Sequence, residues 1–182
     1  RAFRLDGLGE VTAFEVDHPS TQARKRELLA GLAHRTREHV FVAVDFETQS
    51  MEAELLRAGF DAKVPSVWIW EGVTMYLTAE ARRGTVRTVA GLSAPGSELL
   101  LTYVRPDDLS PPISAFGQLG GKLIGEDVRG LWPTEDVDAE LRGGGLAIVE
   151  DSGGPEWGAR YWPDVPAWRY PVWERIAVGR KR

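Results

Sequence analysis

Short apolar runs recur along the first 104 residues, and amphipathic segments separate them. The runs are rich in Val, Ile, Leu and Phe, each is short enough for a single strand, and they lie at residues 11–16, 40–44, 67–70 and 99–104. The segments between them contain residues typical of helix starts and stops, and they predict helices at 21–32, 50–58 and 78–90. Strands that alternate with helices of roughly ten residues predict βαβ units and a mostly parallel sheet flanked by helices. We therefore expect an α/β fold.

This regular pattern ends near residue 104. Residues 105–133 contain four prolines and five glycines without sustained periodicity, which predicts a lid or an irregular insert. A further helix is predicted at 134–141 and two last strands at 146–150 and 173–178, with an aromatic segment between the strands. The sequence shows no internal repeat and no low-complexity segment, so we expect residues 1–182 to form a single domain.

Three successive predicted strands end in a carboxylate, namely Asp17, Asp45 and Glu71. Because the carboxyl ends of parallel strands share one edge of a sheet, these acids are expected to converge on one ligand-binding crevice. Asp17 is placed to accept hydrogen bonds from ribose hydroxyls, and Asp45 with Phe46 suits a base that needs a hydrogen bond and an apolar wall. Glu71 suits a cationic group such as an amine. The alternative interpretation is structural, because acids are also favoured where helices begin.

Composition narrows the range of partners. The formal net charge is −5 and the isoelectric point is near 5.3, which does not favour a general nucleic-acid or anionic-membrane partner. The chain has no cysteine and no apolar run long enough to cross a membrane, so we expect a cytoplasmic protein. Of the three histidines, His34 and His39 are expected at the surface, between a helix and a strand, and no cluster has metal-ligand spacing. We therefore expect no metal.

Four motifs form a specific combination: FEVDHP at 14–19, VDFE at 44–47, WEGVTMYL at 70–77 and ARY at 159–161. This combination resembles the leucine carboxyl methyltransferase family of S-adenosylmethionine-dependent O-methyltransferases. It is most similar to the actinobacterial branch that contains polyketide and other small-molecule methyltransferases. The resemblance spans nearly the whole chain, although residues 105–133 match poorly.

The resemblance implies a Rossmann-like class I methyltransferase fold and S-adenosyl-L-methionine as the cofactor. It also implies that Asp17 binds the cofactor ribose, and that Asp45 and Phe46 flank its adenine. Glu71 would contact the methionine end. The partner would be a small-molecule methyl acceptor and neither a nucleic acid nor a membrane, with the protein a monomer or a homodimer.

The acceptor side of the implied site rests on fewer residues. Tyr76 and Tyr103 lie just beyond two strand ends, and the resemblance implies that they line the acceptor pocket. A carboxylate acceptor is already ionised at neutral pH and needs no general base, whereas a hydroxyl acceptor needs one. His18, next to the ribose acid, is the histidine expected near the crevice, and we assign it to cofactor binding rather than to catalysis. No catalytic residue is assigned.

The resemblance also implies that a part of the family's site lies upstream of Arg1. In the family, the first strand and a glycine-rich cofactor loop directly precede the segment that corresponds to residues 1–5. That strand lies between the strands that end in Asp17 and Glu71, so we expect the fold to be N-terminally truncated. Two other functions stay open. A nicotinamide-dependent oxidoreductase also binds ribose through a strand-end acid, and a non-catalytic domain could keep the fold without turnover.

Overall fold

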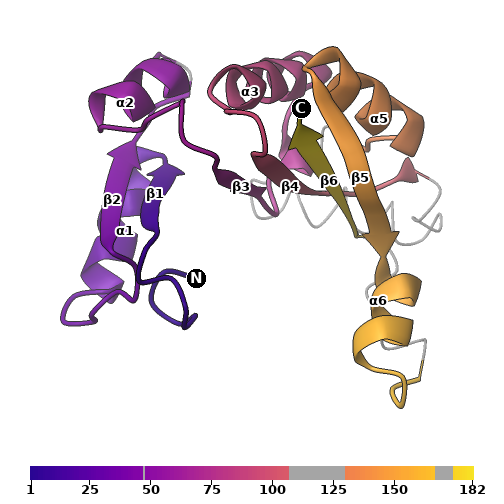
Figure 1. Cartoon of the computed structure of the whole chain (residues 1–182), viewed down its shortest axis with the longest axis horizontal. Helices are drawn as coiled ribbons and strands as arrows, with labels where there is room; N and C mark the ends of the chain where they lie inside the picture. Colours follow the sequence, from indigo (N-terminus) through magenta and orange to yellow (C-terminus); the bar gives the residue numbers. More distant parts are fainter. Residues whose placement is uncertain (47, 107–129, 167–173) are drawn as a thin grey trace. The chain divides into compact units, whose positions relative to one another are not determined.

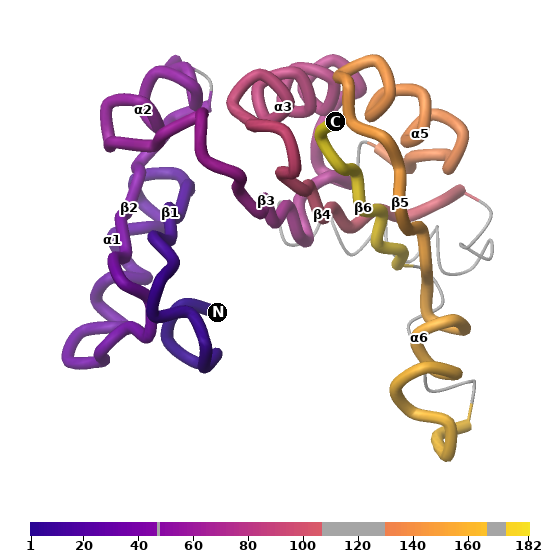
Figure 2. Tube along the Cα trace, in the orientation of Figure 1, coloured from indigo at the N-terminus to yellow at the C-terminus, as the bar shows by residue number. Residues whose placement is uncertain are grey.

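The computed structural model describes residues 1–46, 48–106, 130–166 and 174–182. The chain divides into two compact units, Arg1–Asp61 and Ala62–Arg182, which are called here the first unit and the second unit. Figure 2 traces the backbone through both of them. The expectation of a single domain stays a prediction, and most of the expected insert at 105–133 lies outside the described residues.

The first unit contains two parallel strands, and each of them is followed by a helix. In chain order these are β1 (Thr12–Asp17), α1 (Pro19–Leu28), β2 (Glu38–Ala43) and α2 (Met51–Arg57). The register runs from Thr12 beside Glu38 to Asp17 beside Ala43, so both strands have their carboxyl ends at one edge. The predicted strand–helix–strand–helix order is confirmed. The first helix starts earlier than predicted, because His18 caps it, and it ends at Leu28, before Gly31 with φ +83°.

The second unit is built on a sheet of four strands in the order β3-β4-β6-β5 (Figure 1). Its elements are β3 (Val67–Trp70), the 3-10 helix η1 (Thr74–Tyr76), α3 (Ala79–Gly91), β4 (Glu98–Tyr103), α5 (Thr134–Gly143), β5 (Leu146–Gly153), α6 (Gly154–Tyr161) and β6 (Arg175–Lys181). Strands β3 and β4 are parallel, whereas β6 runs antiparallel to both β4 and β5. The sheet is therefore mixed, because β6 runs opposite to the other three strands.

The core of the second unit lies between its sheet and two helices. Figure 1 shows α3 and α5 side by side along the sheet, and the Cβ of a side chain at Gly144 would lie 3.0 Å from Val86 of α3. Leu99 and Leu101 of β4 and Leu141 of α5 are fully buried, so the apolar side of each element faces this core. A side chain at Gly130 would collide with the guanidinium of Arg82 and the carbonyl of Leu77, so only glycine fits there.

Helix α6 was not predicted. It lies in the segment that the sequence marked only as aromatic, and Gly154 and Pro155 begin it. The Glu156 carboxylate accepts a hydrogen bond from the Gly153 N–H at 3.0 Å, which satisfies a backbone donor at the helix start. Strand β5 is also longer than predicted, since it continues from residue 150 to Gly153.

Candidate functional site

Asp17 is the last residue of β1, and its carboxylate lies at the start of α1. One of its oxygens accepts the backbone N–H of His18 at 2.8 Å, which orients the carboxylate. A carboxylate offers about four acceptor positions, so further hydrogen bonds to a ligand remain possible. The ring Nδ1 of His18 lies 2.7 Å from Ser20 Oγ and 3.3 Å from Ser20 N, so the histidine serves as the helix cap.

Asp45 lies at the same edge of the first unit, two residues beyond the end of β2. The Val44 N–H donates to the Asp17 carbonyl at 2.9 Å, which extends the pairing of the two strands to their carboxyl ends. The Thr48 hydroxyl donates to Asp45 Oδ2 at 2.8 Å, and the Asp45 carbonyl accepts the backbone N–H of Gln49. This turn holds the carboxylate in place, and Phe46 next to it is 60% exposed. The structure thus brings Asp17 and Asp45 to neighbouring strand ends.

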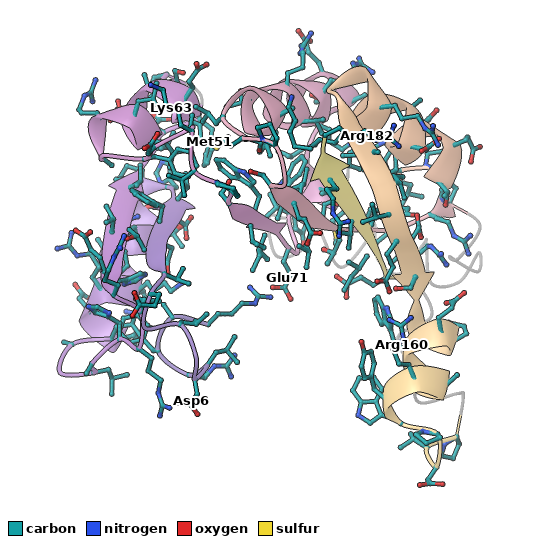
Figure 3. All side chains as sticks on the ribbon, viewed as in Figure 1. Asp6, Met51, Lys63, Glu71, Arg160 and Arg182 are labelled. Carbon is teal, nitrogen blue, oxygen red and sulfur yellow. The ribbon has the colours of Figure 1, made fainter. Side chains whose placement is uncertain are left out.

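Glu71 follows β3 in the second unit and is exposed on the turn that leaves the sheet (Figure 3). Gly72 has a φ of +72°, a backbone conformation that glycine adopts without strain. The Gly72 N–H donates to Thr102 Oγ1 at 2.9 Å, and the Thr74 hydroxyl donates to the Thr102 carbonyl at 2.6 Å. The turn is therefore attached to β4 at two points. Tyr76 ends the short helix η1 that follows and is partly buried.

Tyr103, at the carboxyl end of β4, is fully buried within a hydrogen-bonded network. Its hydroxyl donates to Asp151 Oδ2 at 2.6 Å and lies 3.0 Å from Thr134 Oγ1. Burial raises the pKa of Tyr103, and the hydrogen bond to the Asp151 carboxylate raises it further. The other oxygen of Asp151 accepts Arg175 Nε at 2.7 Å and Nη2 at 2.6 Å. The network joins the ends of β4, β5 and β6.

The expectation of a surface position is wrong for His39. Its side chain is 3% exposed, and Nε2 lies 3.3 Å from Glu15 Oε2. Rings of Phe3 and Phe41 contact it edge-on, with centroids 5.0 Å and 4.4 Å away. Burial lowers the pKa of His39 despite the neighbouring Glu15 carboxylate, because desolvation outweighs that attraction. The contact between His39 and Phe3 of the N-terminal segment could not be predicted from the position of the histidine between a predicted helix and a predicted strand.

Comparison with known proteins shows which protein family the chain is similar to. The model of the family described as "Leucine carboxyl methyltransferase" matches residues 1–90. The chain is related to the leucine carboxyl methyltransferase family. A protein of Mycolicibacterium smegmatis named "Putative S-adenosyl-L-methionine-dependent methyltransferase" is 39% identical over 138 residues, which are 75% of this chain and 44% of that protein. The resemblance predicted from the motifs is confirmed, and the chain spans less than half the length of the curated relatives it matches.

Solved structures show the fold of this chain. A DUF574 family protein from Streptomyces avermitilis superposes with a TM-score of 0.70 at 18% identity, covering 96% of this chain and 66% of that one. An O-methyltransferase family protein from Burkholderia thailandensis gives a TM-score of 0.59 at 20% identity, covering 93% of this chain and 43% of that one. At this identity the likeness shows the fold alone, and the predicted Rossmann-like class I methyltransferase fold is confirmed.

The predicted site residues are divided between the two units. Asp17, His18, Asp45 and Phe46 belong to the first unit, whereas Glu71, Tyr76 and Tyr103 belong to the second. Asp17, Asp45, Glu71 and Tyr103 lie at or just beyond the carboxyl ends of parallel strands, whereas Tyr76 lies at the end of η1. The convergence of all three acids on one crevice stays a prediction, and so do the individual ligand assignments.

Sequence reasoning missed Asp151, Arg175, Thr102 and Thr74. Asp151 had a usable signal, because it is an acid at the end of an apolar run, like the three acids that were selected. Thr102 had a weaker one, as a polar residue inside the run at 99–104. Nothing in the sequence marked Arg175, since its pairing with Asp151 depends on how β5 and β6 are aligned.

The described residues were also searched for membrane-spanning helices and for clusters of metal-binding side chains. None of the helices in the described parts of the chain has the length and apolarity that crossing a lipid bilayer requires. Among the same residues, His, Asp and Glu side chains form no group of three or more that could hold a metal ion. The expectation of a metal-free site stays a prediction.

Proposed function

We propose that the full-length protein is an S-adenosylmethionine-dependent O-methyltransferase that methylates a carboxylate or hydroxyl of a small molecule. The observation that supports this most directly is the pair Asp17 and Asp45, at the carboxyl ends of two neighbouring parallel strands. In open α/β sheets, that edge is where nucleotide-like ligands bind. The relationship to a methyltransferase family favours this cofactor over a nicotinamide.

The residues present fit the adenosine part of this cofactor. The Asp17 carboxylate is oriented by one backbone N–H and keeps acceptor positions for two ribose hydroxyls. The Asp45 carboxylate is held by the Thr48 hydroxyl and can accept a hydrogen bond from an exocyclic amine of a base. The exposed ring of Phe46 offers an apolar surface beside it. Glu71 is proposed to attract the ammonium group at the methionine end.

The proposed mechanism relies on position more than on acid–base chemistry. Bound S-adenosylmethionine supplies an electrophilic methyl group on a sulfonium. The protein's residues hold the reactants in line and exclude water, and such positioning can contribute about 7–11 kcal/mol to lowering a barrier. A carboxylate acceptor is ionised at neutral pH, so the chain needs no imidazole base for it. This is consistent with His18 Nδ1 being engaged as a helix cap.

The acceptor is proposed to be a polyketide-type metabolite or a similar secondary metabolite, methylated in the cytoplasm by a monomer or homodimer. Tyr76 is partly exposed and can contact such an acceptor. Tyr103 is fully buried and its hydroxyl is bonded to Asp151 and Thr134, so we propose that it supports the pocket wall without donating a proton. Neither a nucleic acid nor a membrane is part of the proposal.

Calorimetric titration of the full-length protein with S-adenosylhomocysteine tests the proposed function. Asp17→Asn should weaken binding by at least about tenfold, because hydrogen bonds to a charged acceptor each contribute about 1.5–3 kcal/mol. Glu10→Gln is the matched control, since Glu10 is an exposed acid of the first unit that precedes β1 and lies away from the carboxyl ends of the strands. Absence of binding to the unmodified protein would favour the non-catalytic alternative. Binding that Asp17→Asn leaves unchanged would remove Asp17 from the site.

A further inference from the structure

The turn after β3 is fixed by two threonines to which the sequence assigned no role. We propose that Thr102 and Thr74 are positioning residues, which hold the Glu71 carboxylate where it meets the ammonium end of the cofactor. This inference rests on the proposed function, because it concerns how tightly that end is bound. It adds a source of cofactor affinity that lies on β4 and η1, outside the residues proposed to touch the ligand.

The alignment of β3 with β4 brings the two threonines to the turn. Trp70 lies beside Leu101 in the parallel register, so Glu71 leaves the sheet next to Thr102, which stays in β4 and pairs with Ile176 of β6. The Thr102 side chain accepts the Gly72 N–H at 2.9 Å. The Thr102 carbonyl accepts the Thr74 hydroxyl at 2.6 Å. Both hydrogen bonds therefore end on one residue, and they hold the backbone one and three residues after Glu71.

The burial of these hydroxyls indicates that the role of the two threonine side chains is to form the hydrogen bonds. Thr102 is 7% exposed and Thr74 is 1% exposed, and the neighbours of Thr102 in β4, Leu101 and Tyr103, are fully buried. At such positions a valine of almost the same shape would fill the space without the cost of desolvating a hydroxyl. A buried hydroxyl is retained at little cost only where a hydrogen bond satisfies it. Here, the Thr102 hydroxyl accepts the backbone N–H of Gly72 in the turn, and the Thr74 hydroxyl donates to the backbone carbonyl of Thr102 in β4.

A fixed turn matters because Glu71 itself is exposed. An exposed carboxylate gains little from a cation when its own freedom must be lost on binding. A carboxylate whose backbone is already fixed loses less entropy, so more of the attraction remains as affinity. Gly72, with φ +72°, allows the turn to form but does not rigidify it, since glycine is the most flexible residue. The two hydrogen bonds to Thr102 of β4 supply rigidity to this turn.

The test compares two ligands that differ at one end. S-adenosylhomocysteine carries the amino-acid group, whereas 5′-methylthioadenosine has the same adenosine without it. Affinities for both are measured by calorimetry on the full-length protein. Thr102→Val should weaken S-adenosylhomocysteine by about tenfold and change 5′-methylthioadenosine by less than about twofold, because only the former reaches Glu71. Thr102→Ser keeps the hydroxyl and should restore the affinity.

Three further variants separate positioning from damage to the fold. Thr74→Val should show the same ligand-selective loss as Thr102→Val. Thr85→Val is the matched control: Thr85 makes its hydroxyl bond to Ala81 within α3, away from the turn, so neither affinity should change. In a Glu71→Ala background, Thr102→Val should cause no further loss, because residues that act through one group are not additive.

Each outcome bears on a different step. If the unmodified protein binds neither ligand, the proposed function fails. If it binds both and Thr102→Val leaves both affinities unchanged, the function stands and the positioning role is wrong. Equal weakening of both ligands would also overturn the role, because it indicates general damage. A full additional loss in the Glu71→Ala background would show that Thr102 acts independently of Glu71.

Discussion

The two units place acids at strand ends in the same way but differ in how much core supports them. In the described part of the first unit, the buried apolar side chains are Val42, Val44 and Leu55, around a two-stranded sheet. The second unit has four strands and buries a much larger set, among them Leu99, Leu101, Trp132, Leu141 and Leu146. A two-stranded sheet is at best marginally stable without further packing.

The two units also differ in how the strand-end carboxylates are held, either by near neighbours in the sequence or by another strand. Asp17 and Asp45 are oriented by hydrogen bonds to residues one and three positions away, His18 and Thr48. Glu71 depends on a partner strand, because the turn that carries it is bonded to Thr102. We infer that the Asp17 and Asp45 carboxylates are ordered locally, whereas the Glu71 turn takes its order from the larger core of the second unit.

The largest expected effect comes from matched core truncations, one in each unit. Leu55 and Leu99 are both fully buried leucines, and replacing either by Ala should cost about 2–5 kcal/mol. A loss of this size exceeds the folding free energy that we expect from the small core of the first unit, so Leu55→Ala should remove the protection of backbone amides from exchange across residues 1–61. Leu99→Ala should leave the second unit folded but less stable. Peptide-resolved hydrogen exchange measures both. Leu28→Ala, at a side chain 69% exposed, is the control.

Equal protection of both units from hydrogen exchange in the Leu55→Ala protein would contradict the conclusion that the first unit has the weaker core. It would mean that the first unit is supported by more than its own buried side chains. Collapse of both units in either variant would mean that they unfold as one cooperative body.

Removal of Asp151 tests the support of the second unit. The Asp151 and Arg175 side chains are 15% and 14% exposed, so Asp151→Ala leaves a nearly buried guanidinium without its partner and should cost about 2–4 kcal/mol. Asp138→Ala breaks the exposed pair between Asp138 and Arg142 and should cost less than about 0.5 kcal/mol. Urea unfolding of both variants measures the difference. Equal costs would show that burial of the first pair has no energetic consequence.

The two units should also respond to opposite ends of the pH range. The lowered pKa of His39 means that the unfolded state binds its proton more readily, so stability of the first unit is present above pH ~6.5 and is lost as pH falls below it. The raised pKa of Tyr103 makes the second unit lose stability as pH rises above ~10. Hydrogen exchange as a function of pH follows each unit separately. His39→Gln and Tyr103→Phe should flatten the respective dependence, and an unchanged slope would show that other groups cause it.

Much of this architecture could be predicted from the sequence, because its signals are local. The strand Val67–Trp70 was predicted residue for residue, and Thr78 is the predicted N-cap of α3. Asp17 and Asp45 were found because a parallel strand delivers its last residue to a known edge. The network of Tyr103, Asp151 and Arg175 could not be found in this way, because it depends on the antiparallel register of β6 between β4 and β5.

The smallest expected effect concerns two matched helix caps, and it tests whether local order is equivalent in the two units. Ser50 accepts the Ala53 N–H at 3.3 Å at the start of α2, and Thr78 accepts the Ala81 N–H at 3.2 Å at the start of α3. Replacing either by Ala should cost about 1 kcal/mol. The same cost should raise exchange throughout α2 but only near the start of α3, because the longer helix also packs against a core. Uniform exchange along α3 in Thr78→Ala would show that its packing adds no order beyond the cap.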